Sequence, residues 1–146
     1  VTPWHTYREL AEERLYDYLK KMIPSDLSME KVIFNFHCPP YASNLDDAPE
    51  IDEQLNVINA GHTLVPVGSK AVRQLIEEYQ PLMSLHGHIH EGKGTARIGR
   101  TLSINAGSMY EQGVLQGVVV DLDPNPKKGF FGGTKSHIRS YTLTTG

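Results

Sequence analysis

The sequence predicts a mixed α/β fold in which helices alternate with buried strands and a β-meander follows. Two observations lead to this class. In the first half, two stretches with helix-like spacing of apolar residues are each followed by a short, nearly continuous apolar run. In the second half, runs of strand-forming residues are separated by turns that contain glycine or proline. With 146 residues, 39% of them hydrophobic, the chain is long enough to bury one core.

Two amphipathic helices are expected. The first follows a capping box at Thr6 and Glu9 and ends before Pro24. Its apolar stripe comprises Leu10, Leu15, Leu19 and Met22. The second begins after Ser69, a suitable N-cap residue, and ends before Pro81. Its apolar stripe comprises Val72, Leu75, Ile76 and Tyr79.

The strands are expected in two groups. The apolar runs at residues 31–36 and 82–85 indicate strands that are buried on both faces. Residues 95–98 and 101–105 flank Gly99-Arg100, a two-residue turn typical of a β-hairpin. Two further strands are expected at residues 114–122 and 136–143. Residues 38–66 have little periodicity and are expected to form a long surface loop.

Composition excludes several classes of function. The net charge is −3, from 14 basic and 17 acidic residues, and the positive charges are scattered, so no nucleic-acid-binding signature is present. No apolar run exceeds three residues, the length of the run at 118–120, which is far shorter than the roughly 20 residues that cross a membrane. The single cysteine, Cys38, cannot form an internal disulfide and fits a reducing compartment. We therefore expect a cytoplasmic protein without a membrane partner.

Histidines follow both of the predicted buried strands. His37 comes directly after the first strand, and His88 and His90 come after the second. In open α/β sheets, ligands bind outside the carboxyl ends of the strands. If the two strands are neighbours, their ends bring these imidazoles together around a transition metal. Gly87 is expected to let the chain turn there, because glycine tolerates positive φ.

Three short motifs around these histidines resemble a known family. They are Phe36-His37-x-Pro39, Gly87-His88-x-His90 and Ile104-Asn105-Ala106-Gly107-Ser108. In this order they are similar to the second half of the calcineurin-like metallophosphoesterases, although family members usually have proline where Ala106 stands. The stretch around Trp4 and Arg8 is similar to the helix entry of bacterial and archaeal members.

The resemblance implies a fold, a reaction and a set of site residues. Residues 1–146 would be the C-terminal part of a single domain, and that domain would be a four-layer α-β-β-α sandwich. His37 and His88 would bind one metal ion and His90 a second, with Asn105 and Ser108 lining the substrate pocket. The ions would be Mn²⁺, Fe or Zn²⁺, and the reaction would be hydrolysis of a phosphodiester or a phosphomonoester.

Three other motifs of the family are absent from the chain, namely D-x-H, G-D-x-x-D and G-N-H-[DE]. In the family they supply the bridging carboxylate, an asparagine ligand and the histidine that protonates the leaving group. We therefore expect no catalytic side chain in this segment, and we expect the N-terminal half of the same domain as its partner. The chain alone should be inactive or nearly so. The alternative is a non-catalytic module that binds a metal or a partner.

The remaining candidate residues are expected to have structural roles. His86 has no matching role in the family and should be packed or should support a ligand. Cys38 should behave as a small buried hydrophobic residue. The Gly68-Ser69-Lys70 stretch lacks the full phosphate-loop pattern, so helix capping is expected there. His62 should be exposed to solvent.

Overall fold

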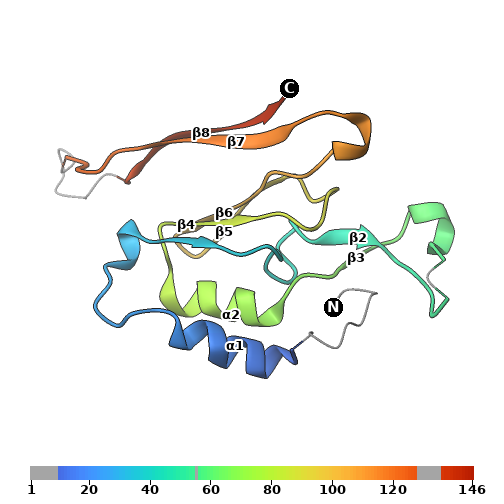
Figure 1. Ribbon diagram of the computed structural model, residues 1–146, viewed down its shortest axis with the longest axis horizontal. Coiled ribbons are helices and arrows are strands. Elements are labelled where there is room, and N and C mark those ends of the chain that lie inside the picture. The colour runs from blue at the N-terminus through green and yellow to red at the C-terminus, as the bar shows by residue number, and fades with distance from the viewer. Residues whose placement is uncertain (1–9, 55, 128–135) are drawn as a thin grey trace.

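A computed structural model describes residues 10–54, 56–127 and 136–146 of the chain. Its centre is a four-stranded sheet with two helices on one side and a separate β-hairpin on the other (Figure 1). The predicted mixed α/β class is therefore confirmed. The capping box at Thr6 and Glu9 and the stretch around Trp4 and Arg8 lie outside the described residues.

The central sheet has the strand order β1-β4-β6-β5. Its strands are β1 (Ile33–Asn35), β4 (Met83–His86), β5 (Gly94–Ile98) and β6 (Thr101–Asn105). Strands β1 and β6 both run parallel to β4, so the carboxyl ends of all three lie at the same end of the sheet. Strand β5 is antiparallel to β6 and joins it through a turn with Gly99 at φ +59°, as predicted.

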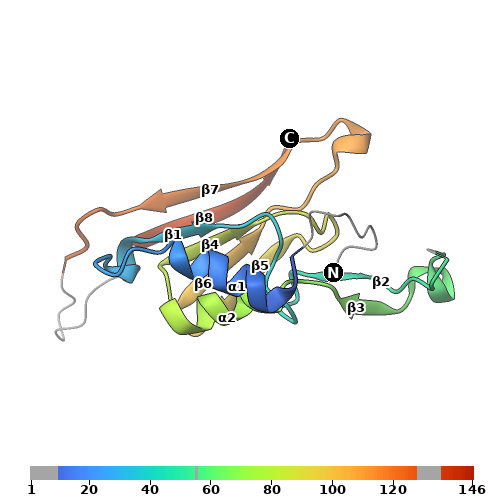
Figure 2. The ribbon, with the colours of Figure 1, turned by 60° about the horizontal axis from the view of Figure 1, so that its bottom comes forward.

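Both α-helices cover the same face of the sheet. Helix α1 (Glu12–Lys21) and helix α2 (Lys70–Tyr79) lie side by side there (Figure 2). The prediction for α2 is confirmed, because the Val72 N–H donates to Ser69 Oγ at 3.2 Å and caps the helix. The core on this face comprises Phe34, Val72, Leu75, Ile76 and Ile98.

Helix α1 packs on the core with only part of the predicted stripe, because Leu19 contacts the core whereas two other predicted residues do not. Leu10 and Met22 are 42% and 76% exposed. The side chains that pack on the core are Tyr16, Leu19 and Ile23. The orientation is set at the start of the helix, where the Glu12 carboxylate accepts hydrogen bonds from Ser69 Oγ at 2.8 Å and from the Ala71 N–H at 2.7 Å. The spacing of apolar residues could not reveal this bond between the two helices.

A β-hairpin covers the other face of the sheet. It consists of β7 (Gln116–Leu122) and β8 (Ile138–Thr145), which pair with each other in an antiparallel ladder. Its inward residues pack on the sheet residues Met83, Leu102 and Ile104. The predicted strands are thus present, but the meander is interrupted, because β7 and β8 form a sheet of their own and do not continue from β6.

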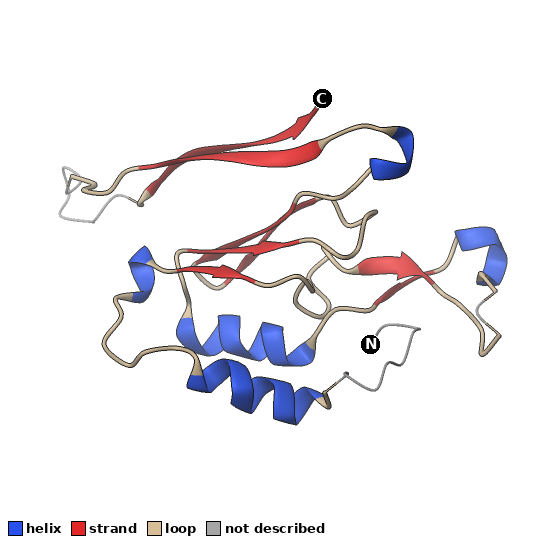
Figure 3. Ribbon diagram, in the orientation of Figure 1, coloured by secondary structure: helices blue, strands red, loops and turns tan. Residues whose placement is uncertain are grey.

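Residues 38–66 contain regular structure where a loop was predicted. Strands β2 (Asp47–Pro49) and β3 (Leu64–Pro66) pair in an antiparallel ladder, and a bridge joins Ile51 to Val57. A short 3₁₀ turn, η2 (Ile58–Gly61), lies between the two strands. We call residues 47–66 the β2–β3 arm, because they project beyond the central sheet (Figures 1 and 3). Two strands of three residues are too short to give a recognisable periodicity.

Strand β1 is an edge strand, although the sequence predicted burial on both of its faces. Its residues alternate between exposed and buried, and Ile33 is 39% exposed. The reason is that, among the described residues, β1 pairs with β4 alone, so its outer edge has no partner strand. Another 3₁₀ turn, η1 (Met29–Lys31), leads into this strand. In the described parts of the chain, no helix is long and apolar enough to cross a membrane.

Candidate metal centre

The ends of β1 and β4 bring two of the predicted histidines together. These strands are parallel neighbours, with Asn35 opposite Leu85, so His37 and the loop that contains His88 leave the sheet at the same end. The ring centroids of His37 and His88 are 5.0 Å apart. His37 Nε2 and His88 Nδ1 lie 3.3 Å apart and form a hydrogen bond, in which one ring nitrogen donates and the other accepts. The sequence placed both side chains at neighbouring strand ends, and the structure shows them in contact.

His88 lies at the centre of a strained three-residue turn. The Ile89 N–H donates to the Gly87 carbonyl at 2.7 Å, and His88 itself has φ +63°. These are the features of a γ-turn with positive φ, which is rare and costs about 1–3 kcal/mol in a non-glycine residue. The sequence suggested Gly87 as the residue with positive φ, but the structure places that conformation on the histidine. The turn aims the His88 ring at His37.

The buried Asn105 side chain holds this turn from the core side of the loop. Its side chain is fully buried, and its amide nitrogen donates to the Ile89 carbonyl at 2.9 Å and to the Leu45 carbonyl at 3.0 Å. Its side-chain oxygen, Oδ1, accepts from the Gly107 N–H at 2.9 Å. We expected Asn105 to line the substrate pocket, whereas the structure places it beneath the loop as a support. Gly92 completes the packing, because a Cβ there would lie 2.2 Å from the Leu45 carbonyl oxygen.

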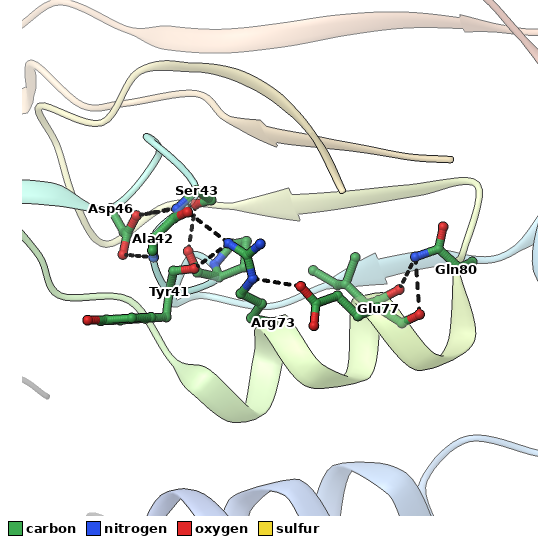
Figure 4. Close-up of polar contacts among 9 residues, drawn as sticks. Tyr41, Ala42, Ser43, Asp46, Arg73, Glu77 and Gln80 are labelled. Carbon is green, nitrogen blue, oxygen red and sulfur yellow. Dashed lines mark hydrogen bonds and ion pairs between the residues drawn. The ribbon is translucent and has the colours of Figure 1, made fainter. Parts of the chain in front are cut away.

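The segment that follows His37 is held in turn by α2. Arg73 Nη1 donates to the carbonyls of Tyr41 and Ala42 at 2.9 and 2.7 Å (Figure 4).

A buried carboxylate holds the same segment from within. The Asp46 carboxylate accepts from the backbone N–H groups of Ala42 and Ser43. It also accepts from the Gly68 N–H at 2.9 Å. Both loops that carry the paired histidines are therefore anchored by buried or half-buried polar side chains.

His86 lies beneath the same two loops. It is 7% exposed, and burial lowers the pKa of its imidazole to about 4, so the ring is neutral at physiological pH. Its position fits the prediction of a packed or supporting residue. The neighbouring Cys38 is half-buried, and burial raises the pKa of its thiol. The thiol therefore stays protonated, which fits its predicted role as a small hydrophobic residue.

His90 and Ser108 line a cavity whose walls include neither His37 nor His88. The His90 ring packs edge-on against the ring of Tyr110, with centroids 5.4 Å apart. The cavity has a volume of about 450 Å³ and polar walls, and Ser108, Tyr110 and Gln116 line it together with His90. Tyr110 belongs to a 3₁₀ turn, η3 (Tyr110–Gln112). Neither Tyr110 nor Gln116 stood out in the sequence, because Tyr110 lies in a connection without a motif and Gln116 begins a strand without one.

The three predicted ligands do not form a single cluster. Among the described residues, no three histidine, cysteine, aspartate or glutamate side chains come together as a group that could hold a metal ion. His90 is nevertheless close enough for its charge to contribute to lowering the pKa of His88, after the larger effect of burial and that of His37. The structure thus unites His37 with His88 and leaves His90 at the cavity.

The paired imidazoles fit two positions in the coordination sphere of one metal ion. Two imidazole nitrogens at about 2.0–2.1 Å from a tetrahedral ion lie about 3.3–3.4 Å apart. The distance from His37 Nε2 to His88 Nδ1 is 3.3 Å. Burial and the neighbouring histidines lower the pKa of His88, which favours the neutral form that a metal requires. His37 is exposed, so the pair is open to solvent on one side.

Comparison with known proteins gives one distant relative. The chain is 28% identical over 106 residues to the uncharacterized protein MJ1162 of Methanocaldococcus jannaschii. The match covers 71% of this chain and 42% of that protein, so the chain spans about two fifths of its relative's length. No family model matches the chain. No solved structure matches it either.

Proposed function

We propose that this chain supplies histidine ligands to the two-metal site of a calcineurin-like metallophosphoesterase that hydrolyses a phosphate ester. The observation that carries the proposal is the 3.3 Å separation of His37 Nε2 and His88 Nδ1 across two parallel strand ends. A strained turn aims one ring, and buried side chains hold both loops. The family motifs around His37, His88 and residues 104–108 give the same assignment. A reducing compartment, such as the cytoplasm, suits the single cysteine.

In this proposal the chain's residues divide between two ions and a substrate cavity. His37 and His88 hold one ion, and His90 holds the other from the rim of the cavity. Divalent ions supply Lewis-acid stabilisation of the charge that develops on a phosphoryl group. The ester's alcohol part occupies the cavity, where Ser108 offers a hydroxyl and Tyr110 an aromatic face. The exposed Tyr110 ring also holds the His90 imidazole in position through its edge-on contact.

The remaining ligands come from the N-terminal half of the domain, which we place at the free edge of β1. Apolar side chains beside this edge are exposed, and they include Met22, Leu27 and Ile33. These three side chains, together with Leu19 of α1, line an apolar cavity of about 230 Å³. An unpaired strand edge with exposed apolar neighbours is suited to receive a further strand. The half-sheet described here would then complete the four-layer sandwich that the resemblance implies.

The decisive experiment combines the chain with the polypeptide encoded upstream of it. The combined protein, loaded with Mn²⁺, is assayed with bis(p-nitrophenyl) phosphate and with p-nitrophenyl phosphate. We expect hydrolysis of at least one ester, no activity from the chain alone, and loss of activity in the His88→Ala variant. A combined, folded protein that cleaves neither ester with Mn²⁺, Zn²⁺ or Fe²⁺ would overturn the proposal.

A second candidate is a metal-binding module without catalysis. It is favoured by the ligands found among the described residues, where the imidazoles of His37 and His88 meet and no carboxylate joins them. Two neutral ligands can hold a borderline ion but do not build a two-metal site by themselves. Metal binding by the combined protein without hydrolysis of any ester would support this candidate over the enzyme.

A further inference from the structure

A chain of buried polar groups runs beneath the two site loops and into the core. His86 Nδ1 lies 3.0 Å from the Cys38 carbonyl oxygen, and His86 Nε2 lies 2.9 Å from Ser84 Oγ. The hydroxyl of Ser84 is in turn hydrogen-bonded to that of Ser103 on the neighbouring strand, at 2.8 Å. Both serines are fully buried. Polar groups in such a position are retained only when each finds a partner.

The acceptors in this chain fix the tautomer of His86. A carbonyl oxygen can only accept a hydrogen bond, so the imidazole must carry its proton on Nδ1 and donate it to Cys38. Nε2 is then an acceptor, and the Ser84 hydroxyl donates to it. Because the single Ser84 proton is then used, the bond between the two serines is donated by the Ser103 hydroxyl, whose proton can rotate toward Ser84 Oγ.

The end of β4 therefore binds two consecutive carbonyls of the segment that carries His37. The Gly87 N–H donates to the His37 carbonyl at 3.0 Å. The His86 side chain binds the next carbonyl, that of Cys38, and so continues the ladder beyond the point where the strands end. These two bonds fix the peptide planes on the carboxyl side of His37. The His37 imidazole itself is exposed at the surface, so the backbone on which it stands must be held by these hydrogen bonds.

We propose that His86 is a positioning residue for the metal centre, in which its Nδ1–H holds the Cys38 carbonyl and thereby sets the His37 imidazole at ligand distance from His88. This role rests on the proposed function, because it matters only if the two histidines bind one ion. His86 is not itself a ligand, since both of its ring nitrogens are occupied by other partners.

Isosteric substitutions separate this role from simple packing. The amide nitrogen of asparagine lies two bonds beyond Cβ, as Nδ1 does in histidine, whereas that of glutamine lies three bonds beyond, as Nε2 does. His86→Asn therefore keeps a donor for Cys38, and His86→Gln and His86→Leu do not. A role in packing alone would instead favour the variants that best fill the volume of the imidazole.

The test measures Co²⁺ affinity of the full chain by visible absorption, with urea unfolding as a check on stability. We expect His86→Asn to bind within about threefold of the wild type, and His86→Gln and His86→Leu to bind roughly 10–100-fold more weakly, as supporting groups in metal sites do. His137→Gln makes the same change at an imidazole of the β7–β8 hairpin, whose Nδ1 lies 2.7 Å from the Asp123 carbonyl oxygen, and it serves as the control that should bind within about threefold as well.

Four results would overturn the role. Folded His86→Leu protein that binds Co²⁺ as tightly as the wild type would do so, as would His86→Asn protein as weak as His86→Gln. If the leucine variant does not fold, long-range ¹H–¹⁵N spectra of the wild-type chain decide, because a proton on Nε2 contradicts the proposal and one on Nδ1 supports it. A wild-type chain that binds no Co²⁺, both alone and combined with the upstream polypeptide that supplies the remaining ligands, would instead overturn the metal centre itself, and the role of His86 with it.

Discussion

Two segments that leave the same end of the central sheet differ in what holds them. The loop at residues 87–92 is held by two buried side chains: Asn105 bonds to its backbone, and His86, at the end of β4, bonds to the backbone of the facing loop. The β2–β3 arm is held by its own short ladder and keeps apolar side chains such as Leu64 exposed, at 56%. Both contain residues with strained backbone, His88 in the loop and Asn59 and Ala60 in the arm.

The comparison shows that strain alone does not mark a site. In the arm the positive-φ residues lie in an exposed 3₁₀ turn. In the loop the strained residue places an imidazole against a second imidazole, and buried groups keep it there. Strain indicates function when the surrounding structure enforces it and when it brings reactive groups together. Substitutions of the same kind in the two segments should therefore have different effects.

The largest difference is expected between two asparagines. Asn105→Ala leaves the Ile89 and Leu45 carbonyls and the Gly107 N–H without their buried partner, which should reduce the free energy of unfolding by about 3–4 kcal/mol. Asn56→Ala in the arm removes only the exposed hydrogen bonds from the Asn56 side-chain amide to the Asp52 carboxylate, and it should lower the free energy of unfolding by no more than about 1 kcal/mol. Urea unfolding followed by circular dichroism measures both. Equal losses would contradict the claim that the loop is held from the core.

The stability of the metal-free chain should fall in acid because of His86. The folded state lowers the pKa of this imidazole from 6.5 to about 4, so the unfolded chain binds more protons between these values. The contribution of the neutral His86 ring to the free energy of unfolding is therefore complete above pH 6.5. It is lost progressively as the pH falls towards 4, by roughly 3 kcal/mol in total. Urea titrations at several pH values, compared with those of His86→Asn, isolate this contribution. If the free energy of unfolding of His86→Asn falls with pH as steeply as that of the wild type, His86 is not the cause of the acid sensitivity.

Metal affinity should depend on the paired histidines and not on the histidine of the arm. Loss of either ligand, in His37→Ala or His88→Ala, should weaken Co²⁺ binding by about a hundredfold. This loss equals the largest one seen when a residue that supports a metal ligand is replaced. His62→Ala replaces an exposed imidazole in the arm and should leave the affinity unchanged. Competition with a chromogenic chelator gives the dissociation constants. Comparable losses in all three variants would indicate non-specific binding to surface histidines.

The smallest effect is expected at the exposed apolar surface of the arm. Leu64→Ser changes a side chain that is 56% exposed, so the free energy of unfolding should change by no more than about 0.5 kcal/mol. The same measurement on Leu75→Ser, which alters a fully buried residue of α2, provides the contrast. A large loss in Leu64→Ser would show that the arm packs on a surface that the described residues do not contain.

The features that the sequence predicted correctly depend on local chemistry. Ser69 caps α2, the Gly99 turn joins β5 to β6, and two short apolar runs form neighbouring strands whose ends unite His37 with His88. Each follows from residue spacing or from the rule that parallel strands end together. These local rules were enough to locate the candidate site, although not to describe it.

The features that could not be predicted depend on contacts between distant segments. The support that Asn105 gives to Leu45 spans 60 residues, and the bond from Glu12 that sets the orientation of α1 reaches Ala71. The exposure of β1 depends on which strands pair beside it and not on its own apolar residues. The positive φ of His88 arises because buried groups hold the turn, so a glycine next to it was a misleading signal.

X-ray absorption spectroscopy of the chain loaded with one equivalent of Zn²⁺ tests the paired-histidine centre most directly. The account predicts two imidazole nitrogens at about 2.0–2.1 Å from the ion, with the imidazole signal reduced to one in His37→Ala and in His88→Ala. A spectrum without imidazole ligands, or one that neither substitution alters, would contradict it.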